Sequence, residues 1–89
     1  MLFIIDRPSI SQASQALINA AAHADVDISF VLIGDGVYAM DLPFLADRDV
    51  AILASDARGR GITISENTKA ISGQAFAHLS TLHTHWITL

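Results

Sequence analysis

Short, unbroken apolar runs recur along this chain and are separated by segments with a longer apolar period. Runs of this kind are typical of strands buried on both faces of a sheet. Three strong runs and two weaker ones predict five strands, at residues 2–5, 28–33, 50–54, 69–72 and 84–88. Helical patterns lie between them, and strands that alternate with helices form parallel sheets covered on both faces. Right-handed crossovers should connect these strands.

The longest helical pattern lies between the first two predicted strands. Its apolar spacing predicts a helix over residues 10–24, with Ser9 and Gln12 at the spacing of a capping box. Phe76 and Leu79 belong to the last helical stripe and should pack on the sheet as core residues. The remaining helices should be brief, at residues 37–40, 42–46, 55–60 and 75–82.

A turn of Gly34, Asp35 and Gly36 follows the second predicted strand. Ligands of parallel α/β sheets bind beyond the carboxyl ends of the strands, and the N–H groups at a helix start favour an anion. This turn is therefore our candidate ligand-binding site. The alternative is a tight connection in which Asp35 caps the next helix, as Ser55 or Asp56 could after the third strand. We favour that alternative, because the glycines form no full phosphate-binding fingerprint and Asp35 would repel phosphate.

The composition adds an expectation of assembly. Apolar residues make up 52% of the 89 residues and charged residues only 16%, which is more apolar than an average soluble domain. One domain over residues 1–89 is too small to bury all of this surface internally, so other subunits should cover part of it. Residues 70–89 contain no Asp, Glu, Lys or Arg, and interfaces are depleted in charge. The candidate contact residues are Tyr38, Arg58, Arg60, His85 and Trp86. The alternatives are ordinary core packing for Tyr38 and Trp86 and, for the two arginines, a position late in a helix that complements its dipole.

Charge and cysteine usage narrow the chemistry further. The net charge is −4 with only five Lys and Arg residues, so a basic face for nucleic acid is not expected. The sequence has no cysteine, which excludes disulfides, thiolate metal sites and a persulfide on these residues. Such a composition fits a reducing compartment, and we expect the cytoplasm. No signal peptide or membrane span is predicted, because Asp6 follows the apolar start too early and residues 70–89 are part-polar.

No catalytic constellation emerges from the sequence. Serines are abundant, but none lies in a nucleophile elbow. His78, His83 and His85 could in principle bind zinc. No carboxylate or cysteine lies near them in sequence, so we favour the alternative of polar edge or interface histidines. We therefore expect no metal, no cofactor and no enzymatic activity of this chain by itself.

A set of short motifs at ordered spacings resembles one known family. The motifs cover nearly the whole chain and are Met1-Leu2, Arg7-Pro8, Leu32-Ile33, Asp35-Gly36-Val37, Leu53, Asp56, Arg60-Gly61-Ile62, Phe76, Leu79 and Trp86. In this order they resemble the DsrH/TusB family of small sulfur-relay subunits, one of the DsrE-, DsrF- and DsrH-like groups.

This resemblance implies a fold, a set of partners and a role. The fold is α/β, a three-layer α/β/α sandwich with a five-stranded, mostly parallel sheet. The partners are DsrE/TusD-like and DsrF/TusC-like paralogues in a hetero-oligomer, with self-association as a further possibility. Such complexes pass persulfide sulfur between carriers, and the principal sulfur-carrying cysteine lies on the DsrE/TusD-like partner. By resemblance this chain is then a non-carrier subunit.

The destination of the sulfur stays open at this stage. In many bacteria such a relay serves 2-thiolation of the wobble uridine of tRNA, and in sulfur oxidisers it serves dissimilatory metabolism. The resemblance favours the tRNA relay. The alternatives are a dissimilatory relay subunit and a stand-alone α/β protein that binds a small ligand or anion at the Gly34 turn.

Overall fold

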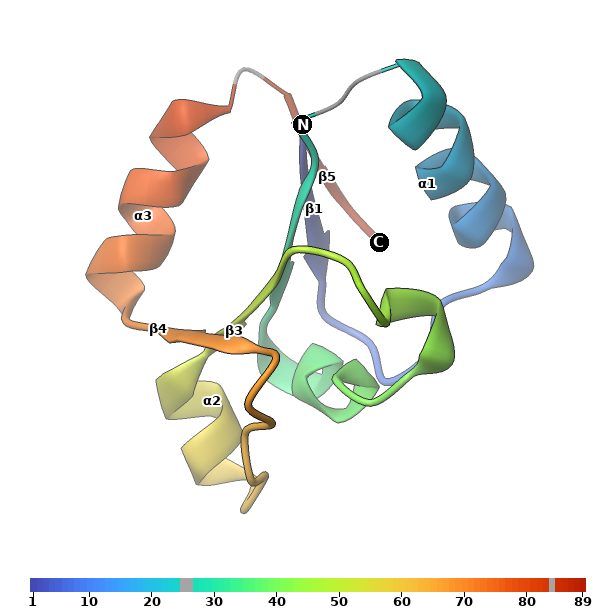
Figure 1. Ribbon diagram of the computed structural model, residues 1–89. Coiled ribbons are helices and arrows are strands. Elements are labelled where there is room, and N and C mark those ends of the chain that lie inside the picture. The colour runs from blue at the N-terminus through green and yellow to red at the C-terminus, as the bar shows by residue number, and fades with distance from the viewer. Residues whose placement is uncertain (25–26, 84) are drawn as a thin grey trace.

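One sheet of five parallel strands forms the centre of the molecule (Figure 1). The computed structural model describes residues 1–24, 27–83 and 85–89. The strands are β1 (Leu2–Ile5), β2 (Ser29–Leu32), β3 (Val50–Leu53), β4 (Lys69–Ile71) and β5 (Trp86–Thr88). Their order across the sheet is β4-β3-β2-β1-β5, and every pair is parallel. The predicted α/β fold with a five-stranded sheet is thus confirmed.

The helices divide unequally between the two faces of this sheet. From β1 to β4 the chain steps across the sheet in one direction, through α1 (Gln12–Ala24), two short 3₁₀ helices and α2 (Ala54–Gly59). It then crosses back through α3 (Gly73–Leu82) to reach β5 beside β1. Since crossovers are right-handed, the reversal places α3 on the face opposite α1 (Figure 1).

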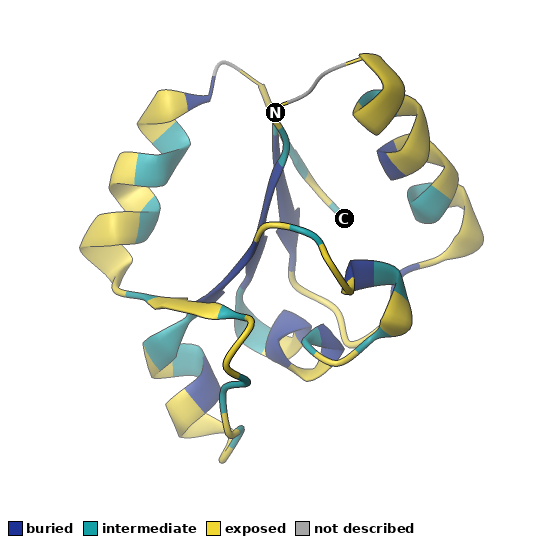
Figure 2. Cartoon of the chain, viewed as in Figure 1, coloured by how far each residue is buried: buried dark blue, intermediate teal, exposed yellow. Residues whose placement is uncertain are grey.

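The core is correspondingly larger on the α1 face. Phe3 and Phe30 are paired in register and stack with ring centroids 5.5 Å apart. Ile18 of α1 and Ala57 of α2 join the same cluster, and both are fully buried. The opposite face contributes a second, smaller cluster, whose buried members are Leu2, Ile4, Val31 and Ala51. Figure 2 shows the contrast, with many buried residues in β1, β2 and β3 and none in α3.

The start of α1 differs from the prediction by a short shift. The helix begins at Gln12 rather than at residue 10, and the backbone N–H of Ser14 donates to Oγ of Ser11 at 3.1 Å. Ser11 therefore provides the capping oxygen, and the predicted box of Ser9 with Gln12 is wrong. The capping residue is the one directly before the first helical residue, and because the helix begins at Gln12 that residue is Ser11.

Neither predicted cap after β2 or β3 forms. The helix η1 (Gly34–Ala39) begins at the turn itself, and its N-cap residue Ile33 makes no side-chain cap. The helix α2 begins at Ala54 without a side-chain cap, so neither Ser55 nor Asp56 caps it. Instead, both predicted carboxylate caps bond to other segments, as the next subsection describes. The second 3₁₀ helix, η2 (Pro43–Leu45), lies within the predicted range.

The last part of the chain departs from the prediction in two ways. Phe76 and Leu79 pack against the smaller cluster but are only partly buried, so their assignment to the core was too strong. The strand β5 begins at Trp86, so His85 lies before it, and position 84 is outside the described residues. The predicted strand over residues 69–72 ends at Ile71, because Ser72 caps α3 by accepting from the Ala75 N–H at 3.1 Å.

Candidate functional site

The Gly34 turn lies at the carboxyl end of β2 and is bonded to the end of the neighbouring strand. The backbone N–H of Gly34 donates to Oδ2 of Asp56 at 2.7 Å. Asp56 belongs to α2, which follows β3 directly. Because β2 and β3 are adjacent and parallel, their carboxyl ends meet at one edge, and this brings the two segments together. Gly34 has a φ of +52°, which is the left-handed region that favours glycine.

The carboxylate of Asp35, in the turn itself, forms an ion pair with Arg60. Nε of Arg60 lies 3.2 Å from Oδ1 of Asp35, and Nη1 of Arg60 donates to the carbonyl of Asp56 at 3.3 Å. The side chain of Asp35 is 65% exposed, so water screens this ion pair strongly. Two carboxylates thus lie at this point, Asp35 of the turn and Asp56 of α2, and the N–H groups of both Gly34 and Gly36 are already bonded. Ligand binding at Gly34, Asp35 and Gly36 stays a prediction.

Gly36 is required by a close approach of two backbone segments. Its N–H donates to the Ile33 carbonyl at 2.8 Å, and the Ile33 N–H donates to the Ile5 carbonyl at 3.0 Å. A Cβ placed on Gly36 would overlap that Ile5 carbonyl oxygen. The turn therefore packs directly on the end of β1, which is why the second glycine is needed there.

We predict that Asp56 and Asp35 contribute differently to the free energy of unfolding. Asp56→Ala should lower the free energy of unfolding by about 1–2 kcal/mol, because it leaves the part-buried Gly34 N–H without its acceptor. Asp35→Ala should cost less than about 0.5 kcal/mol, because its pair with Arg60 is exposed. Urea unfolding of both variants measures this difference. Equal losses would show that the Gly34–Asp56 hydrogen bond does not hold the turn.

The structure separates the predicted contact residues into two groups. Tyr38 lies in η1, while Arg58 and Arg60 lie in and just after α2, and these two helices are in contact at the carboxyl end of the sheet. His85 and Trp86 lie at the start of β5, where Trp86 is in register with Leu2 at the amino end of β1. One continuous patch therefore cannot contain all five. Tyr38 is 50% exposed and Trp86 57%, so both leave large apolar surface open to solvent.

Trp86 shares its face of the sheet with α3. Its register partner Leu2 belongs to the smaller core cluster, and side chains in register in a parallel pair point to the same face. Leu82, at the end of α3, is 64% exposed. The α3 face therefore carries two large exposed apolar side chains in a segment of the sequence without Asp, Glu, Lys or Arg.

The histidines near the end of the chain are not equivalent. His83 is buried, whereas His78 and His85 are exposed. Within residues 1–24, 27–83 and 85–89, no group of three His, Asp or Glu side chains is arranged to hold a metal ion. In the same part of the chain, no helix is both long and apolar enough to cross a membrane.

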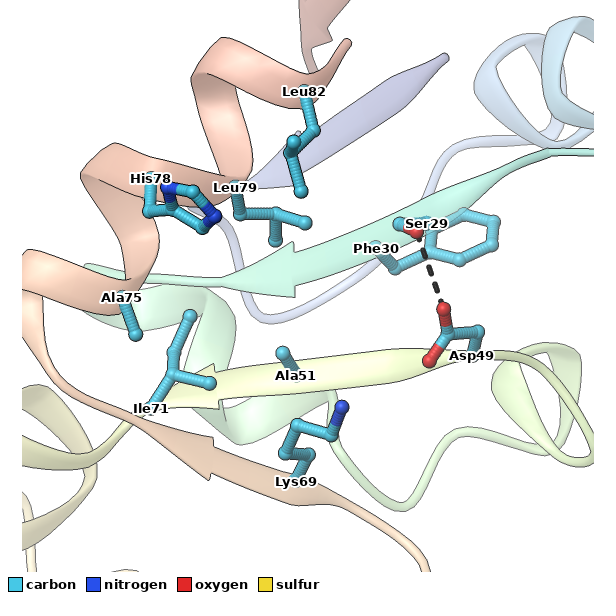
Figure 3. Close-up of a pocket in the computed structure, with 10 residues that line it drawn as sticks. All are labelled: Ser29, Phe30, Asp49, Ala51, Lys69, Ile71, Ala75, His78, Leu79 and Leu82. Atoms are coloured by element: carbon cyan, nitrogen blue, oxygen red, sulfur yellow. Dashed lines mark hydrogen bonds between the residues drawn. The ribbon is translucent and has the colours of Figure 1, made fainter.

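A cavity that sequence reasoning missed opens between α3 and the sheet (Figure 3). Its volume is about 200 Å³. The lining comes from the first residues of β2 and β4, from Asp49 before β3, and from one side of α3. No sequence signal identifies it, because the lining residues belong to four separate segments that only the sheet brings together.

Comparisons with known proteins identify the fold. No family model matches this sequence, and no curated protein matches it. Two solved chains match in structure, and one of them is the ychN protein from E. coli, with a TM-score of 0.65 and 17% sequence identity. The match covers 99% of this chain and 97% of the ychN chain. At this identity the likeness shows the fold alone: the chain shares the α/β fold of the ychN protein over nearly its whole length.

Proposed function

We propose that this chain is the non-carrier subunit of a cytoplasmic sulfur-relay complex that serves 2-thiolation of tRNA wobble uridines. The observation that supports this most is the combination of the α/β fold shared with ychN and a sequence that contains no cysteine. The resemblance of its ordered motifs to the DsrH/TusB family supports the same role. In this proposal the chain neither accepts nor donates sulfur itself.

The chemistry of sulfur transfer explains why such a subunit needs partners. A persulfide forms when a thiolate attacks a sulfane sulfur, so each carrier in the relay must provide a cysteine thiol. This chain provides none, and the thiol must come from a DsrE/TusD-like paralogue. A DsrF/TusC-like paralogue completes the assembly. The contribution of this chain is then contact area, which its exposed Trp86 and Leu82 can provide.

Sulfur-transfer labelling tests the proposal directly. The chain is reconstituted with its DsrE- and DsrF-like paralogues and supplied with labelled sulfane sulfur from a cysteine desulfurase. We expect label on the cysteine of the DsrE-like partner and none on this chain, and we expect transfer to fall when this chain is omitted. A Cys→Ser variant of the partner is the matched control and should remain unlabelled.

Two results would contradict the proposal. The first is covalent label on this chain, and the second is undiminished transfer in its absence. The tRNA destination has its own readout, which is the 2-thiouridine content of tRNA from cells that lack this chain. Unchanged 2-thiouridine together with lost sulfur oxidation would assign the subunit to a dissimilatory relay instead.

A further inference from the structure

The cavity beneath α3 combines an apolar chamber with a charged mouth. It opens on the face of the sheet that α3, a helix of ten residues, covers. Figure 3 shows the side chains that surround it, from the sheet below and from α3 above. The residues that we use below lie outside the Gly34 turn, and they share only Leu82 with the surface that we propose for partner contact.

The apolar end of the cavity is built from small and branched side chains. Ala51 of β3 and Ile71 of β4 form its floor, and both lie on the α3 face of the sheet. Ala75, Leu79 and Leu82 of α3 form the opposite wall, to which His78 adds an imidazole. An apolar cavity of about 150 Å³ can hold a benzene molecule. A volume of about 200 Å³ therefore has room for the side chain of leucine or phenylalanine and little more.

The polar end presents one carboxylate and one ammonium on neighbouring strands. Asp49 precedes β3 and Lys69 begins β4, and both side chains line the cavity. Ser29 Oγ donates to Oδ2 of Asp49 at 3.2 Å, as the dashed line in Figure 3 marks, which fixes the carboxylate and leaves it further acceptor capacity. In the part of the chain that the structure describes, the Lys69 ammonium forms no ion pair with another side chain.

From this arrangement we propose that the cavity binds a free apolar α-amino acid. The ligand's carboxylate pairs with the Lys69 ammonium, and its ammonium pairs with the Asp49 carboxylate. Its side chain enters the chamber beneath Leu79 and Leu82. A zwitterion is the ligand class that matches opposite charges at one end of an apolar space. A ligand with a carboxylate but no ammonium would leave Asp49 without a partner. A ligand with an amine but no carboxylate would leave Lys69 without one.

Ligand titration of the full chain, in its complex if it requires one, tests this assignment. Chemical shifts of residues that line the cavity should respond to L-leucine with a dissociation constant on the order of 1 mM, as expected for a small ligand whose charges remain in water. The analogue 4-methylpentanoate lacks the ammonium, and 3-methylbutylamine lacks the carboxylate. Each should bind about tenfold more weakly, because each loses one charge-assisted hydrogen bond. Glycine, which lacks the side chain, should not bind.

Variants of the lining identify the site. Lys69→Gln and Asp49→Asn should each weaken leucine binding about tenfold, and Asn can still accept from Ser29. Ala75→Leu should abolish binding by filling the chamber. Ala77→Leu is its matched control, because Ala77 is exposed on the same helix and does not line the cavity, and it should bind normally.

Three results would overturn the proposal. One is the absence of any shift at concentrations far above 1 mM, and another is equal binding of leucine and the two single-charge analogues. The third is a response of the same resonances to a paralogue subunit only, which would make the cavity part of a protein contact.

Discussion

Replacing Gly36 with alanine should destabilise the fold more than any other single methyl group added at a glycine of this chain. The new Cβ would overlap the carbonyl oxygen of Ile5, which is backbone and already accepts the Ile33 N–H. Relief requires the turn to move away from β1, and overpacking of this kind costs about 3 kcal/mol. Small domains have only about 5–15 kcal/mol of total stability, so Gly36→Ala should unfold at much lower urea concentration.

Two other glycines provide matched controls for this effect. The Cβ added by Gly34→Ala would meet no neighbouring atom, but the residue would still need a positive φ. This variant should therefore lose about 1 kcal/mol of the free energy of unfolding. Gly59→Ala also meets no atom and ends α2 without a positive φ, so it should be neutral or slightly stabilising. A Gly36→Ala variant as stable as Gly59→Ala would contradict the close packing of the turn on β1.

Replacing Trp86 with alanine should weaken assembly while leaving the fold intact. Trp86 is 57% exposed at the first position of the edge strand β5, so its removal should change the free energy of unfolding by less than about 1 kcal/mol. As a buried interface anchor it would contribute about 2 kcal/mol to association, or about thirtyfold in the dissociation constant. Sedimentation of the complex and urea unfolding of the chain measure the two effects separately.

The control for Trp86 is Leu17, an exposed apolar residue of α1 on the other face. Leu17 is 44% exposed, and Leu17→Ala should affect neither assembly nor fold appreciably. Unfolding of the Trp86→Ala chain would place this side chain in the core instead. Equal association of the two variants would remove the start of β5 from the interface.

Three of the strands could be predicted because each is an unbroken apolar run. Val50–Leu53 is such a run, and it begins directly after the polar Asp49. The alternation of strands and helices likewise specified a parallel sheet. The boundaries were accurate to within one or two residues in β2 and α1, and the order of the strands was left open by the sequence.

The contacts around the turn could not be predicted, because they depend on the order of strands. The local sequence offers Asp56 as one of two possible caps of its own helix, yet its carboxylate accepts from the N–H of Gly34, which lies 22 residues earlier. The requirement for Gly36 depends on β1, since the backbone of Ile5 and Asp6 fills the space beside it. The partial burial of Phe76 and Leu79 has a similar origin, because in residues 1–24, 27–83 and 85–89 no helix besides α3 packs on that face to enclose them.

Co-expression with the paralogues tests the central proposal most directly. The chain is produced together with DsrE-like and DsrF-like proteins from the same genome, and the intact mass of the purified assembly is measured under native conditions. The proposal predicts a stoichiometric hetero-oligomer that contains this chain, and an oligomeric or poorly soluble chain when it is produced alone. A soluble monomer at micromolar concentrations that enters no complex with either paralogue would contradict it.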